Sequence, residues 1–310
     1  RLDLDDDTIL MSINGTIGNL AIYRNEPVIL GKSAAYIRLK NSVCTHFLFD
    51  VLASDRTQRD FESELTGTTI RNLSLRTIRN TPILLPDISE QRRISAILGV
   101  WKRSIETVEA LIANSRAQKQ ALMQQLLPQG TTPPKKRLHG FSGEWREAKL
   151  GSLADISKGE QKGRASLAEE GPVPVINGGI TPSGYTEHPN TAANTITISE
   201  GGNSCGHVDL IRQPFWCGGH CYALKNLKVE RDYLFAVLKH RERQIMSLRV
   251  GSGLPNIQKK ALSQFSIPVP PKSEQVEIGE LAASADREIA AQEAQLTALR
   301  QEKAALMQQL

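Results

Sequence analysis

Five side chains that could serve as zinc ligands are concentrated between residues 205 and 221 of this 310-residue sequence. In chain order they are Cys205, His207, Cys217, His220 and Cys221. Zinc binds thiolates and imidazoles, but structural zinc sites use ligand spacings such as C-x2–4-C and H-x3–5-H. The pattern C-x-H…C-x-x-H-C fits none of them. We therefore interpret these residues as buried thiols and loop histidines, and we expect no metal site.

A second candidate for chemistry is Gly31-Lys32-Ser33, which is similar to the end of the nucleotide-binding loop GxxxxGK[ST]. The first glycine of that motif would be residue 26, which is Glu26, and a carboxylate there would repel phosphate. The sequence also lacks the Asn-Pro-Pro-aromatic tetrapeptide of a methyltransferase and a carboxylate pair with a lysine at nuclease spacing. Glu302-Lys303 reads as the solvated face of a helix. We therefore predict no catalytic residue, no metal and no cofactor in this chain.

Composition sets the outer limits of the interpretation. Hydrophobic residues make up 40% of the chain, which is typical of a globular protein of two ordinary domains. No apolar run approaches the ~18 residues of a membrane span, and the first residues do not resemble a signal peptide. The four cysteines are unevenly spaced, which favours a reducing compartment, so we expect a cytoplasmic protein. The net charge of +5 is compatible with a polyanionic partner.

The elements that would position any site are organised as an internal repeat. Residues 89–126 match residues 273–310 without a gap at an offset of 184, with 16 of 38 positions identical. Further upstream the offset becomes 186 and then 187, at which Ser12 matches Ser199. The chain therefore consists of a variable region and a repeated segment, followed by a second copy of each.

Each repeated segment is predicted to form one long helix, with Ser89 and Ser273 as N-caps. Apolar residues at alternating spacings of four and three form a coiled-coil stripe, with breaks at Ser115, Lys119, Gln292 and Lys303. The stripe consists of Trp101, Ile105, Val108, Ile112, Leu122 and Leu126 in the first copy, and of Ile278, Leu281, Ala285, Ile289, Leu296, Leu299, Leu306 and Leu310 in the second.

A helix of 38 residues is about 55 Å long and would extend beyond one small domain. We predict that the two helices pack antiparallel, with an approximate two-fold axis relating the halves of the chain. The alternative is that each helix packs against its own domain.

The variable regions are predicted to be mixed α/β. Strands are expected at Thr8–Ser12, Thr195–Ser199 and Ile267–Val269, between Gly-, Asn- and Pro-rich turns. An amphipathic helix is expected at Asp232–Arg243, with its counterpart at about residues 50–64. The fold class is therefore α/β (α+β), with two domains joined by two long helices. We expect a domain at 1–88, a helix at 89–127, a linker at 128–137, a domain at 138–272 and a helix at 273–310.

This organisation resembles the specificity subunit of type I restriction–modification enzymes. Residues 138–145, Leu-His-Gly-Phe-Ser-Gly-Glu-Trp, and then Leu150-Gly151 look like the start of a target recognition domain in that family. Gly251, Leu254-Pro255-Asn256-Ile257 and Ile267-Pro268-Val269-Pro270, leading into Ser273-Glu274-Gln275, resemble the end of such a domain. No single motif is very specific, but the resemblance covers essentially the whole chain and its order occurs twice.

The resemblance implies a non-catalytic subunit whose two domains each read half of a bipartite double-stranded DNA target. The half-sites would face opposite ways, separated by about one DNA turn (~34–36 Å). The implied partners are two modification subunits, which hold S-adenosylmethionine, and a motor–nuclease restriction subunit that uses ATP and Mg. One alternative is the specificity subunit of a related system in which methylation and cleavage share one chain. Another is a coiled-coil scaffold with heads that bind carbohydrate or protein.

Candidate DNA contacts are polar loop residues, because sequence is read by side chains at base edges. In the second domain they are Lys158, Gln161, Lys162, Arg164, Asn177, Thr181, Ser183, Tyr185, Asn203, Ser204, His207, Arg249, Ser252 and Asn256. In the first domain they are Asn14, Asn19, Lys32, Ser33, Thr68, Arg71 and Asn72. For each one, a plain solvated loop is the alternative interpretation. The basic linker Lys135-Lys136-Arg137 is a candidate for phosphate contact.

Outward helix positions that the two copies share are candidates for docking the modification subunits. They are Arg103, Glu109, Arg116, Arg287, Glu293 and Arg300. The alignment of the halves also leads us to expect that the chain begins inside its first recognition domain, without counterparts of Leu150 to Ile176.

Overall fold

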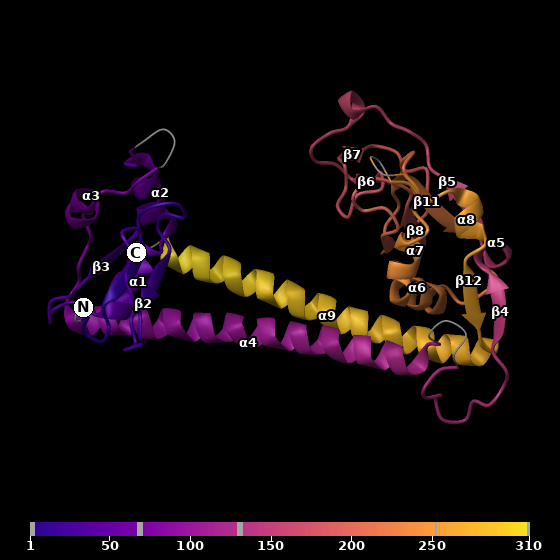
Figure 1. The fold of residues 1–310 in the computed structure, drawn as a ribbon, viewed down its shortest axis with the longest axis horizontal. Helices are drawn as coiled ribbons and strands as arrows, with labels where there is room; N and C mark the ends of the chain where they lie inside the picture. The colour runs from indigo at the N-terminus through magenta and orange to yellow at the C-terminus, as the bar shows by residue number, and fades with distance from the viewer. Residues whose placement is uncertain (1–3, 67–70, 129–132, 252, 254, 309–310) are drawn as a thin grey trace. The chain divides into compact units, whose positions relative to one another are not determined.

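The computed structural model describes residues 4–66, 71–128, 133–251, 253 and 255–308 (Figure 1). Four residues named from the sequence, Thr68, Ser252, Leu254 and Leu310, lie outside this part of the chain. The chain divides into two compact units, which are described separately. Unit 1 contains residues 1–112 and 291–310, and unit 2 contains residues 113–290.

In its described part, the domain of unit 1 is a small antiparallel sheet with three short helices. The strand order is β2-β1-β3. The elements are β1 (Ile9–Ser12), β2 (Leu20–Ile22), β3 (Ala34–Ile37), α1 (Thr45–Leu52), α2 (Asp55–Ser63) and α3 (Leu75–Asn80). Ile9 and Met11 of β1 alternate inward and pack with Leu48, Leu52 and Phe61. The strand predicted at Thr8–Ser12 is thus confirmed as β1.

The helix predicted at about residues 50–64 is two helices, and its predicted start was wrong. The first begins at Thr45 and ends at Leu52. Ser54 then caps α2, because its side-chain oxygen accepts a hydrogen bond from the backbone N–H of Thr57 at 3.3 Å. A serine hydroxyl that satisfies the free N–H groups of a new helix favours such a break.

Unit 2 contains a larger domain with nine strands in its described part. The central sheet is antiparallel with the order β5-β11-β8-β9, and β10-β6-β7 and β12-β4 form smaller sheets. The strands are β4 (Arg146–Lys149), β5 (Asp155–Lys158), β6 (Val173–Ile176), β7 (Tyr185–Thr186), β8 (Thr195–Ser199), β9 (Val208–Ile211), β10 (Trp216–Cys217), β11 (Cys221–Lys225) and β12 (Ser266–Val269). The helices are α5 (Leu150–Leu153), η1 (Arg164–Ser166), α6 (Arg231–His240), α7 (Glu242–Met246) and α8 (Lys259–Ser263). The predicted strands in this half are confirmed, and the predicted helix corresponds mainly to α6.

The sheet register confirms the internal repeat. In unit 1 Ser12 pairs with Ala34, and in unit 2 Ser199 pairs with Cys221, so both partners are related by the offset of 187. The loops at this edge repeat as well. Isolated bridges join Asn14 to Asn72 and Gly201 to Asn256. The two domains therefore share one core topology despite their different sequences.

The two long helices are α4 (Ile88–Leu126) and α9 (Lys272–Met307), and they pack antiparallel (Figure 1). Within unit 1, Arg300 donates to Glu109 at 2.6 Å. Within unit 2, Lys119 forms an ion pair with Asp286. The residue numbers of the contacts rise along α4 as they fall along α9, so the two helices are antiparallel, as predicted.

Two details of the helix prediction were wrong. Ser89 and Ser273 lie inside the helices rather than at their caps. For α4 the capping group is Asp87, whose Oδ1 accepts from the Glu90 N–H at 2.9 Å. Leu281 of the predicted stripe is 39% exposed, whereas Ala282 beside it is buried. The first turns of α9 face their own domain, which rotates the buried stripe by one position.

Each long helix is attached to its domain by a glutamine of the repeated Ser-Glu-Gln sequence. Gln91 Oε1 accepts from the Cys44 N–H at 2.8 Å, and Gln275 Oε1 accepts from the Glu230 N–H at 3.0 Å. In both copies Nε2 donates to the carbonyl of the proline five residues earlier. Cys44 and Glu230 are the N-cap residues of α1 and α6, and neither side chain makes a capping hydrogen bond. The glutamine instead accepts a hydrogen bond from the backbone N–H of the N-cap residue, at the start of the helix where backbone N–H groups lack helical partners.

Candidate nucleic-acid interface

Several loops of unit 2 meet at one edge of the central sheet. Lys158 ends β5 opposite Tyr222, and Ser199 ends β8 opposite Cys221, the first residue of β11. The chain therefore leaves β5 and β8 and enters β11 at the same edge. We call this the loop edge of unit 2, made of Lys158, residues 159–161, 177–178, 200–207, 218–220 and 255–257. Many of the polar residues named from the sequence lie on it.

Direct hydrogen bonds hold these loops together. Asn177 Oδ1 accepts from the His220 N–H at 3.0 Å, and Ser199 Oγ donates to the Gly178 carbonyl at 2.6 Å. Gly159 follows β5 so closely against the next turn that a Cβ atom there would lie 2.3 Å from the Gly218 carbonyl oxygen. Only glycine permits that approach. The loop edge is a packed surface whose loops support one another.

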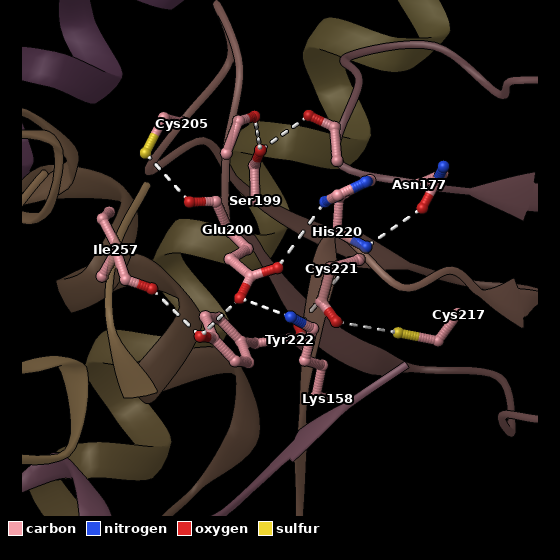
Figure 2. Close-up of polar contacts among 12 residues, drawn as sticks. Lys158, Asn177, Ser199, Glu200, Cys205, Cys217, His220, Cys221, Tyr222 and Ile257 are labelled. Carbon is pink, nitrogen blue, oxygen red and sulfur yellow. Dashed lines mark hydrogen bonds and ion pairs between the residues drawn. The ribbon is translucent and has the colours of Figure 1, made fainter. Parts of the chain in front are cut away.

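A buried carboxylate, Glu200, lies at the centre of the loop edge (Figure 2). Lys158 Nζ is 2.7 Å from its Oε1, the Tyr222 hydroxyl is 3.1 Å from the same atom, and His220 Nδ1 is 3.7 Å from Oε2. Burial and the neighbouring Glu200 raise the pKa of Tyr222 to about 12, so the phenol remains protonated and can donate. A buried carboxylate is costly unless it is paired in this way.

Lys162 and Trp216 form a second contact beside the loop edge. Lys162 Nζ is 4.1 Å from the centre of the Trp216 ring and 2.5 Å from Thr186 Oγ1. The indole N–H donates to the Glu160 carbonyl at 2.9 Å. The cation–π geometry and the two hydrogen bonds fix the lysine and the indole against each other.

The predicted DNA-contact residues of unit 2 fall into an exposed group and a partly buried group. Those exposed to solvent are Lys158, Gln161, Arg164, Thr181, Ser183, Asn203, Arg249 and Asn256. Those partly buried are Lys162, Asn177, Tyr185, Ser204 and His207. Tyr185 belongs to β7, where its backbone pairs with Ala168 and Pro174. Asn177 and Lys162 already hold neighbouring groups through their side chains.

His207 is engaged with the helical side of the domain. Its Nδ1 is 3.3 Å from Glu242 Oε1, and Lys239 Nζ is 2.5 Å from Glu242 Oε2. Burial would raise the pKa of Glu242, but the hydrogen bonds from His207 and Lys239 together outweigh it and hold that pKa below its usual value. His207 therefore has a structural partner in unit 2.

Unit 1 presents a matching loop edge. The residues named from the sequence that the structure describes there are Asn14, Asn19, Lys32, Ser33, Arg71 and Asn72, all exposed except the half-buried Asn14. Their backbones repeat the unit 2 pattern, because the Ser33 carbonyl accepts from the Ile13 N–H at 2.9 Å as the His220 carbonyl does from Glu200. Gly31-Lys32-Ser33 leads into a strand, β3, whereas a nucleotide-binding loop leads into a helix.

The sequence analysis did not identify Glu200, Tyr222 or Trp216 as part of the site. One signal for Glu200 was available in the repeat, because the offset of 187 places Ile13 at its position in the first copy. A carboxylate that replaces an apolar residue in a shared fold needs a local partner, and Lys158 provides it.

Three of the four cysteines, Cys205, Cys217 and Cys221, belong to the core of unit 2 and its loop edge, whereas the half-buried Cys44 lies in unit 1. Cys217 and Cys221 are buried, and Cys205 donates to the Glu200 carbonyl. Burial raises the pKa of the Cys205 thiol.

Within residues 4–66, 71–128, 133–251, 253 and 255–308, no group of three or more His, Cys, Asp or Glu residues is placed to hold a metal ion. In the same part of the chain, no helix has the length and apolar character needed to cross a membrane.

The basic linker before the domain of unit 2 has a partner inside the protein. Arg137 Nε is 3.0 Å from Glu274 Oε1, and Arg137 also donates to the Gly143 carbonyl at 2.6 Å. Glu274 is fully buried at the start of α9. Arg137 therefore neutralises a buried carboxylate, while its neighbours Lys135 and Lys136 are exposed.

The helix residues proposed for partner docking have mixed environments. Glu109 and Arg300 pair with each other, and Arg287 pairs with Glu280 of its own helix at 2.5 Å. Arg103 and Arg116 are exposed, and Glu293 is half-buried. Two apolar residues at matching positions of the repeat, Ile97 and Leu281, are also exposed on the helices.

Comparisons with known proteins match most of this chain to one protein family. A family model described as the type I restriction modification DNA specificity domain matches residues 2–114 and 142–301. A putative type I specificity subunit from Mycoplasma pneumoniae is 37% identical over 139 residues, and one from Mycoplasma genitalium is 33% identical over 138 residues. Each alignment covers 44% of this chain and only 36% of the relative. The crystal structure of a type I restriction–modification S subunit from M. genitalium has a TM-score of 0.73 at 21% identity, over 99% of this chain and 83% of that one.

Proposed function

Because the chain belongs to the type I restriction–modification DNA specificity family, we propose that it reads DNA sequence for a type I complex and does no chemistry itself. One observation carries the proposal: the same loop edge occurs twice, on two domains that share a register but carry different loop residues. A protein that reads two different half-sites needs one frame used twice with different side chains. A single enzymatic site would not require the repeat.

Each loop edge would read one half of a bipartite double-stranded target. The exposed amides and cations there, such as Asn72 and Asn256, are groups that recognise base edges or phosphates. The paired helices α4 and α9 would act as the spacer between the two reading domains. This spacing role accounts for a gap-free repeat in the helices beside variable sequences in the loops.

The implied partners supply the chemistry. Two modification subunits, which would bind S-adenosylmethionine, would dock on the repeated helix surfaces, and a restriction subunit using ATP and Mg would complete the enzyme. The residues Arg103, Glu109, Arg116, Arg287, Glu293 and Arg300 remain the proposed docking positions. Ile97 and Leu281 add an exposed apolar contact to each copy of that surface.

The direct test is to express the chain with its modification partner in a host that lacks other methyltransferases and to map methylated bases across the genome. We expect one bipartite motif with a fixed spacer. Purified complex should also bind a DNA duplex of that motif with an affinity that falls as salt rises. A complex that binds duplex DNA without sequence preference or salt dependence would favour the scaffold interpretation and contradict the proposal.

A further inference from the structure

We propose that Glu200 is a positioning residue that sets the specificity of the second half-site by fixing Lys158 and the loops around it. The inference rests on the proposed function and adds a residue to it. It concerns unit 2 alone, because Ile13 stands at the matching position of unit 1.

The side chain of Glu200 contacts two strands directly and reaches a third segment through Tyr222. This side chain is 9% exposed, and its carboxylate receives hydrogen bonds from Lys158 at the end of β5 and from Tyr222 on β11. The Tyr222 hydroxyl also lies 3.0 Å from the Ile257 carbonyl oxygen. The ammonium of Lys158 is therefore held at the loop edge by a buried anion while its side chain remains 52% exposed.

The backbone of Glu200 joins the loops themselves. Its N–H donates to the His220 carbonyl at 2.9 Å, and its carbonyl accepts from the Ile257 N–H at 2.8 Å and from the Cys205 thiol at 3.1 Å. Asn256, the exposed neighbour of Ile257, thereby takes its position from the same residue. A shift of Glu200 would move several candidate reading groups together.

Charge gives the residue a second role. A carboxylate at a surface that receives phosphate raises the free energy of binding unless a cation neutralises it. Lys158 provides that neutralisation, and His220 Nδ1 lies 3.7 Å from the other oxygen. The pair keeps Lys158 from acting as a free cation that attracts any DNA sequence equally.

Two variants separate positioning from general affinity. Glu200→Gln keeps the shape and an acceptor oxygen but removes the charge that fixes Lys158. We expect its affinity for unrelated DNA to rise, and its discrimination against an altered second half-site to fall by about tenfold, the effect of one misplaced base contact. Lys158→Arg retains the ion pair and should retain most of the discrimination.

The experiment measures binding of the assembled complex to three duplexes: the cognate target, the target altered in its first half and the target altered in its second half. Asp155→Asn is the matched control, because it removes one carboxylate from the first residue of β5, the strand whose last residue is Lys158. We expect Glu200→Gln to lose discrimination for the second half-site only, with Asp155→Asn unchanged. The thermal midpoint of each variant reports on folding.

Three outcomes would overturn the inference. Glu200→Gln could discriminate the second half-site as wild type does, or lose discrimination equally at both half-sites, or Lys158→Arg could lose it as fully as Lys158→Met. If Glu200→Gln lowers the thermal midpoint strongly, the comparison of Lys158→Arg with Lys158→Met decides. A wild-type complex that discriminates neither half-site would contradict the proposed function itself, which is a different result.

Discussion

The two domains share a strand register but differ in what covers their flanks. In unit 2, β5 pairs with β11 and β4 pairs with β12. In unit 1, β3 is an edge strand of its sheet within the described part of the chain. Leu84 and Leu85 are 75% and 50% exposed there, whereas Val269, which matches Leu85 in the repeat, is 2% exposed. Within the described residues, the repeat thus preserves the loop edge and the helix junction, while the flanking strands β4, β5 and β12 of unit 2 have no counterpart in unit 1.

The largest expected effect tests this difference in burial. Val269→Asp should destabilise unit 2 by at least about 3 kcal/mol, because it places a carboxylate in the core without a partner. Leu85→Asp should change the stability of unit 1 by less than about 1 kcal/mol, because a half-exposed side chain stays in water. Hydrogen exchange of peptides from each unit measures both. Equal losses would show that Leu85 is covered in solution and that the flanks are alike.

The next effect tests what the two units share. Gln91→Ala and Gln275→Ala should each cost about 1–3 kcal/mol, because each removes the bond that caps a helix and leaves buried backbone groups without a partner. The two losses should be similar, since the two glutamines share two contacts, and Gln91→Ala should cost slightly more because Gln91 also donates to the Ser42 carbonyl at 3.1 Å. Denaturant unfolding, again resolved by hydrogen exchange in each unit, gives the values. A large loss at one position with none at the other would break the equivalence of the junctions.

The smallest expected effect is a loss of stability at neutral pH that becomes smaller in acid. The pKa of Glu242 is held below its ordinary value of 4.5, so the charged form stabilises the folded state above the unfolded pKa, and this stability is lost as the pH falls through the folded pKa. Glu242→Gln should lower the stability of unit 2 by about 1 kcal/mol at neutral pH and by less below about pH 4. Arg56 stands at the matching position of unit 1, so Arg56→Gln is the control. A pH-independent effect of Glu242→Gln would show that its charge does not matter.

The comparison also shows what the sequence could predict. The β-branched run Thr195–Ser199 and the offsets between the halves were sufficient for the core strands and the long helices, because both signals are periodic and local. The break at Ser54 and the exposure of Leu281 depend on tertiary contacts that no period encodes. The burial of Glu200 could not be predicted in the same way, because it arises only when Lys158 and Tyr222 arrive from distant strands. Both the domain boundaries and the individual DNA contacts remain predictions.

The central claim, that two equivalent loop edges each read one half-site, is tested most directly by a matched pair of variants. Asn72 and Asn256 are exposed and occupy the same bridge position in the two units. Binding of each assembled complex would be measured on duplexes altered in one half-site at a time. Asn72→Ala should weaken recognition of one half-site by about tenfold and leave the other unchanged, and Asn256→Ala should do the reverse. Loss at both half-sites from either variant, or at the same half-site from both, would contradict the account.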